Sequence, residues 1–159
     1  MQIMTAKKKK NKSKKKSIKV QIIECTPSGF YIQDLDKIEP SEIEQRDLEF
    51  RLNIVSSTNI DEKLIKVELE LDSYLIIDGE ADTQGLFGIK STSIFKTPEI
   101  DDIVNDDGKV TAPDEFMKKL LNISIGGIRG MLAAKLVNTE MRHITLPLLD
   151  LSLMKKEDN

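Results

Sequence analysis

Apolar and polar residues alternate with a two-residue period over most of the first hundred positions. The alternate apolar positions of residues 47–56 are Leu48, Phe50, Leu52 and Ile54. Residues 63–77 repeat the pattern, with one side formed by Ile65, Val67, Leu69 and Leu71. This period is typical of strands with one buried face. Residues 83–97 predict a fourth strand, and residues 20–32 predict a first strand or a hairpin around Thr26-Pro27-Ser28-Gly29.

The pattern changes after Thr97, where residues 98–112 form an acidic connection without strand periodicity. Pro113 suits the first position of a helix, and Asp114 and Glu115 favour its first turn. The helical stripe that follows is Phe116, Leu120, Ile123, Gly127, Met131 and Ala134, and we place the helix end near Asn138. Pro147 breaks the chain before a short amphipathic element at 148–154. The sequence therefore predicts an α+β fold, in which a four-stranded antiparallel sheet precedes a long helix and a short C-terminal helix.

Charge divides the 159-residue chain into two unlike parts. Residues 1–19 contain nine lysines and no acid, whereas the remaining 140 residues contain 15 basic and 27 acidic side chains. We expect residues 1–17 to be a disordered tail, residues 18–156 to form one domain, and residues 157–159 to be a charged end. The lysines of residues 7–16 could contact nucleic acid or an anionic surface, although no aromatic side chain lies among them for base stacking.

The composition offers little for catalysis. The chain has one histidine, His143, one cysteine, Cys25, and no tryptophan. We find no catalytic constellation or metal-ligand spacing, so we expect no enzyme, no cofactor and no metal. The lone cysteine indicates a reducing compartment, and the longest apolar run falls short of a membrane span, so we expect a cytoplasmic protein.

Two motifs have alternative interpretations. The glycines of residues 126–130 lack the context of a phosphate loop and lie inside the predicted helix, which favours close packing against another helix or the sheet. The helix-packing or oligomer positions are Gly126, Gly127, Gly130, Met131 and Ala134. Glu68, Glu70 and Asp72 lie in a row on one strand, which is either a solvated sheet face or a docking surface for a basic partner.

The order of elements resembles the SecB family of protein-export chaperones over roughly residues 18–156. Ser93-Ile94-Phe95 is similar to the family's Gly-Ile-Phe pattern at the end of its fourth strand. The stretch Leu146-Pro147-Leu148-Leu149-Asp150-Leu151 resembles its helix-connecting loop and final helix.

This resemblance implies an ATP-independent holdase that forms a tetramer, a dimer of dimers, and binds unfolded or nascent polypeptides in apolar grooves, for export or for protection of a client such as an antitoxin. The implied groove positions are Phe95, Ile100, Ile103, Val104, Leu146, Leu148, Leu149, Leu151 and Met154. The predicted partner-docking sheet face comprises Glu68, Glu70, Asp72 and Leu86. Leu86 matches an apolar position of the family's docking face for the SecA motor, but the family's acidic docking residue falls at Gly88, which weakens the expectation of SecA docking. The alternatives are a nucleic-acid or anionic-surface binding protein that acts through the tail, and an assembly or adaptor protein of the same fold.

Overall fold

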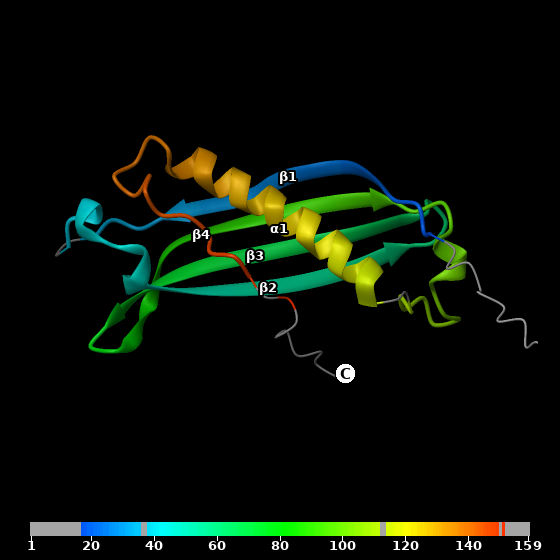
Figure 1. The fold of residues 1–159 in the computed structure, drawn as a ribbon, viewed down its shortest axis with the longest axis horizontal. Coiled ribbons are helices and arrows are strands. Elements are labelled where there is room, and N and C mark those ends of the chain that lie inside the picture. Colours follow the sequence, from blue (N-terminus) through cyan, green and yellow to red (C-terminus); the bar gives the residue numbers. More distant parts are fainter. Residues whose placement is uncertain (1–16, 36–37, 112–113, 150, 152–159) are drawn as a thin grey trace, which may run out of the picture.

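The computed structural model describes residues 17–35, 38–111, 114–149 and 151, and it confirms the α+β fold (Figure 1). Four strands precede one long helix: β1 (Gln21–Ile32), β2 (Leu48–Asn59), β3 (Leu64–Ile77), β4 (Glu80–Lys96) and α1 (Asp114–Leu136). Short 3-10 turns lie at Pro40–Glu42, Gln45–Asp47 and Ile100–Asp102. The lysine-rich tail lies outside the described residues, apart from Ser17.

The strands form one antiparallel sheet in the order β1-β4-β3-β2. The segment 21–32 is a single strand rather than a hairpin, and its ladder with β4 is irregular at Ile22/Glu24 and Pro27/Gly29. Pro27 is tolerated because β1 is an edge strand, where a missing N–H donor need not break a ladder bond. A tight turn joins β3 to β4: Asp78 and Gly79 both have positive φ, 53° and 85°, as such a hairpin requires.

The alternation predicted for β3 is confirmed on both faces. Ile65, Val67, Leu69 and Leu71 are each at most 1% exposed and face the helix, and Phe87 and Phe95 of β4 are fully buried beside them. The opposite face carries the charged residues of β3 and faces away from α1. Burying one face of the two central strands forms the main core of the protein.

The helix crosses the sheet diagonally (Figure 1), and this direction changes which of its residues are buried. Its buried positions are Phe116, Leu120, Ser124, Ile125, Ile128, Leu132 and Leu136. The predicted stripe is therefore wrong at Ile123, which is 37% exposed, and at Ala134, which is also exposed, whereas Gly127 and Met131 are half-buried. Steps of four residues turn 40° more than one full turn, so a stripe with this spacing winds around the helix and follows the diagonal contact.

The two connections that flank the helix carry part of the core. The acidic connection after β4 buries Ile100 and Ile103 and pairs Val104 with Val110. After α1, residues 144–149 have no helix, and most of the predicted C-terminal helix (150 and 152–154) lies outside the described residues. Within the part of the chain that is described, no helix is both long and apolar enough to cross a membrane.

Candidate functional site

A band of incompletely buried apolar side chains lies between β2 and α1. The inward side chains of β2, which are Phe50, Leu52 and Ile54, are only half-buried because β2 is the sheet edge farther from the helix. Met117 and Leu121 of α1 and Leu149 and Leu151 of the final segment are also half-buried and pack against the same core. This band leaves apolar surface open to a ligand.

The band continues into an open cleft of about 510 Å³ at one end of β2. Its lining residues are Ser56, Ser57, Thr58, Gly108, Lys109, Val110, Asp114 and Met117. The Thr58 hydroxyl donates a hydrogen bond to the Gly108 carbonyl at 2.9 Å, which fixes the loop against the strand. The cleft therefore combines the apolar side chains of Val110 and Met117 with polar strand residues and with two charged side chains, those of Lys109 and Asp114.

The predicted groove residues do not form one surface. Phe95, Ile100, Ile103 and Leu146 are at most 4% exposed and belong to the core. Val104, Leu149 and Leu151 are half-buried, and Leu148 is 89% exposed. Met154 lies outside the described residues. A client-facing role thus suits only the exposed and half-buried members of the set.

The predicted docking face is divided. Glu68, Glu70 and Asp72 lie together on the solvent face of β3, but Leu86 is 2% exposed and belongs to the core. Leu86 is the extra residue of a bulge, because Ser73 pairs with Phe87 and Tyr74 pairs with Gly85.

Each acid of the row has a partner. Lys66 pairs with Glu68 at 2.8 Å, and Lys90 pairs with Glu70 at 2.6 Å. The hydrogen bond to Glu70 raises the pKa of Lys90. The Tyr31 hydroxyl donates to Asp72 Oδ1 at 2.9 Å. Lys66 of β3 itself and Lys90 of β4 therefore offset the charges of Glu68 and Glu70, whereas Tyr31 of β1 gives Asp72 a neutral hydrogen-bond donor.

Tyr31 occupies the space above Gly88, where the resemblance places an acidic residue. A Cβ atom at Gly88 would overlap the Tyr31 ring and lie 2.5 Å from Asp72 Oδ1. Burial, and then the hydrogen bond to the Asp72 carboxylate, raise the pKa of Tyr31 above its ordinary value. The departure from the family at Gly88 thus coincides with a tyrosine that reaches across β4 from the edge strand.

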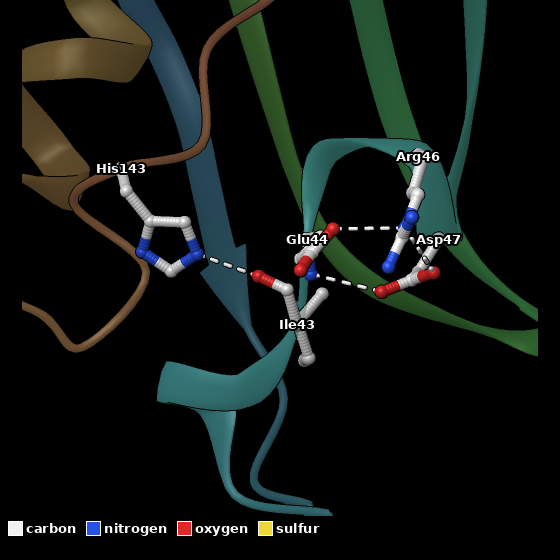
Figure 2. Close-up of polar contacts among 5 residues, drawn as sticks. All are labelled: Ile43, Glu44, Arg46, Asp47 and His143. Atoms are coloured by element: carbon white, nitrogen blue, oxygen red, sulfur yellow. Dashed lines mark hydrogen bonds and ion pairs between the residues drawn. The ribbon is translucent and has the colours of Figure 1, made fainter.

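The connection between β1 and β2 meets the segment that follows α1 along a polar seam (Figure 2). His143 Nε2–H donates to the Ile43 carbonyl at 2.5 Å. On the adjoining turn, Glu44 N–H donates to Asp47 Oδ2 at 2.9 Å, and Arg46 Nε lies 2.8 Å from Glu44 Oε2. These contacts order the turn that carries Gln45.

Gln45 and Arg129 bind the backbone of the final segment. The Gln45 amide donates to the Thr145 carbonyl at 2.5 Å and accepts from the Thr145 N–H at 3.0 Å. Arg129 donates to the carbonyls of Leu146 and Pro147 at 3.3 Å and 3.1 Å. The sequence did not indicate these contacts, because a single glutamine in a connection and a single arginine in a helix have no pattern that marks them.

The glycine motif has two environments. A Cβ at Gly127 would overlap Cys25 Sγ of β1, which confirms close packing against the sheet. A Cβ at Gly126 or Gly130 would have no atom within 4 Å, and Ala134 on the same side is exposed. Met131 is half-buried. Among the described residues, no group of three acidic, histidine or cysteine side chains is placed to hold a metal ion.

No protein-family model and no curated protein sequence matches this chain. Among solved structures, the fold is similar to that of Rv1957, a SecB-like chaperone of Mycobacterium tuberculosis solved in complex with a ChAD peptide from the HigA1 antitoxin. The TM-score is 0.49 and the sequence identity is 10%, and the match covers 82% of this chain and 90% of that one.

Proposed function

We propose that this chain is an ATP-independent holdase that acts in the cytoplasm and binds unfolded or nascent polypeptides on the apolar band between β2 and α1. The observation that carries the proposal is the half-buried row Phe50, Leu52 and Ile54, which continues into the cleft beside Ser56–Thr58. An unfolded chain presents apolar side chains at alternate positions and an unpaired backbone, and a strand edge with an apolar face can satisfy both.

The client is either a protein destined for export or a single dedicated protein such as an antitoxin, the two classes that the sequence resemblance implies. Many weak contacts along an extended chain would provide useful affinity without a deep pocket. The acidic excess of the domain would keep such an apolar surface soluble. The proposed activity is binding alone and uses no cofactor.

The direct test is suppression of aggregation of chemically unfolded clients in the absence of ATP. Exchanging Leu149 and Leu151 for serine should weaken capture while far-ultraviolet circular dichroism stays native. Ile77→Ser is the matched control, because Ile77 is 47% exposed on the β3–β4 hairpin rather than on the band. Failure of the wild-type chain with several clients, including any protein encoded beside its gene, would reject the holdase function.

We further propose that copies of the chain assemble, as far as a dimer of dimers, through the outward side of α1. The exposed glycines at 126 and 130 and the exposed Ala134 would let a second helix approach closely, and Val137 is 56% exposed beside them. Ala134→Glu should lower the mass seen by analytical ultracentrifugation, whereas Lys118→Glu, which changes charge at an exposed position in the first half of α1, should not. If the wild-type chain is monomeric in this measurement, the proposed assembly is wrong, but the proposed holdase function is unaffected.

A second candidate function is binding of nucleic acid through the tail, favoured by the nine lysines of residues 1–19. Affinity should then fall steeply with salt and disappear when residues 1–17 are deleted. Binding that ignores salt, or that survives the deletion, would contradict this candidate.

A further inference from the structure

The segment that follows α1 is held at its backbone by side chains from two other elements. Both backbone polar groups of Thr145, its N–H and its C=O, are bonded to Gln45, and the next two carbonyls, of Leu146 and Pro147, are bonded to Arg129. Residues 144–147 form no helix or strand of their own. Their order therefore depends on the Gln45 and Arg129 contacts and on the side chains that they bury.

The Gln45 contact imitates a β-sheet. A primary amide has a carbonyl oxygen and an N–H that can point to the same side, as the C=O and the N–H of one residue do in a hydrogen-bonded pair of antiparallel strands. Arg129 adds several N–H donors that can reach successive carbonyls. Because all four bonds go to backbone atoms, they do not depend on which side chains the bound segment carries.

The side chains of the segment alternate between the core and solvent. Ile144 and Leu146 are 1% and 3% exposed, whereas Thr145 and Pro147 are exposed. Alternation of this kind is the normal consequence of an extended backbone. The site thus combines two recognition elements, which are polar contacts to any backbone and apolar holes at every second residue.

We propose that Gln45 and Arg129 form a clamp for extended polypeptide backbone, which residues 144–147 fill in this structure and which a client segment with alternate apolar side chains can fill instead. This inference rests on the proposed holdase function and names the way in which clients are recognised. When a client segment takes the place of residues 144–147, it makes hydrogen bonds to Gln45 and Arg129 and apolar contacts of the same kind as those that the internal segment gives up. The bonds to Gln45 lie at the surface, where a client can compete for them.

The test uses the full chain and a labelled peptide with the sequence of residues 143–149, His-Ile-Thr-Leu-Pro-Leu-Leu, measured by fluorescence anisotropy. Thr145→Pro removes the N–H that Gln45 accepts, so it loosens the internal segment and leaves the clamp intact. Since a larger fraction of molecules then has a vacant clamp, we expect the peptide to bind at least about threefold more tightly than it binds the wild-type chain. Adding Gln45→Ala to Thr145→Pro should abolish that gain.

Matched controls separate the clamp from general surface effects. Gln33→Ala removes a glutamine whose hydrogen bond is to Gln84, outside the clamp. Arg142→Ala removes an exposed arginine beside the segment. Adding either control substitution to Thr145→Pro should leave peptide affinity the same as in the Thr145→Pro variant alone. A peptide with serine in place of its isoleucine and leucines should bind none of the variants.

Hydrogen exchange of the wild-type chain provides a measurement that needs no substitution. If an unfolded client displaces the internal segment, amides of residues 144–149 should exchange faster when the client is bound. Client binding with unchanged or slower exchange there, or a natively folded Thr145→Pro variant with unchanged peptide affinity, would overturn the clamp alone. Absence of any client binding by the wild-type chain would instead overturn the holdase function on which the clamp rests.

Discussion

Replacing Gly88 by alanine should destabilise the fold, although the change adds only one methyl group on the solvent face of the sheet. The new Cβ would overlap the Tyr31 ring and crowd the Asp72 carboxylate. Tyr31 is 43% exposed, so its ring can swing into solvent rather than force the backbone apart. The cost is then the lost ring contact together with the hydrogen bond to a carboxylate, about 1–3 kcal/mol in the free energy of unfolding.

The measurement is urea denaturation of both proteins at one fixed concentration, because assembly would make the apparent stability depend on concentration. Gly29→Ala is the matched control within the sheet, since its Cβ would make only ordinary contacts with the Lys90 side chain at 3.8–3.9 Å, and it should raise stability by about 0.5–1 kcal/mol. In a Tyr31→Ala background, Gly88→Ala should cost less than half as much as in the wild type. An unfolding free energy unchanged by Gly88→Ala would refute the packing of Tyr31 against β4.

Two further changes test the packing of the sheet. Gly127→Ala would bring a methyl group onto Cys25 Sγ and should lower the urea midpoint. Combining it with Cys25→Ala should restore most of the loss. An unchanged midpoint in the Gly127→Ala variant would show that α1 does not pack closely on β1. In a Tyr74→Phe variant, absorbance at 295 nm should report ionisation of Tyr31 at a pH above the ordinary 10.0, and Asp72→Asn should lower that midpoint. Because the folded-state pKa is the higher one, the stability provided by this hydroxyl is retained below pH 10 and lost as the pH rises through the folded-state value. Ionisation near pH 10 would contradict the hydrogen bond between Tyr31 and Asp72.

The sheet could be predicted from the sequence because its signal is local. Alternation along residues 64–77 follows directly from the strand geometry, and Asp78-Gly79 marks the turn whatever the rest of the chain does. The long helix could be predicted as an element, but the side of it that is buried could not. That side depends on the angle at which α1 crosses the sheet, which is a tertiary property absent from any window of sequence.

The site was predicted less well, for two physical reasons. A bulge of one residue moves every later side chain to the other face, and the irregularity at Tyr74 and Gly85 places Leu86 in the core rather than beside Asp72. Long-range polar contacts leave no periodic trace. Gln45 and Thr145 are 100 positions apart, and only the folded chain shows that they meet.

The two sides of the sheet have different capacities for binding. On the outer side, a basic partner would have to break the pairs of Glu68 and Glu70 with lysines, and each exposed pair contributes about 0–1 kcal/mol to stability. The pairs are weak, so they do not bar docking. They do remove the uncompensated acidic charge that would draw a basic partner from a distance, since opposite charges a few ångströms apart largely cancel beyond one Debye length. On the helix side, the apolar side chains of the band stay half-buried, so part of their surface remains open to a ligand. The driving force for binding an unfolded chain therefore lies on the helix side, where the apolar band and the Gln45–Arg129 clamp both occur.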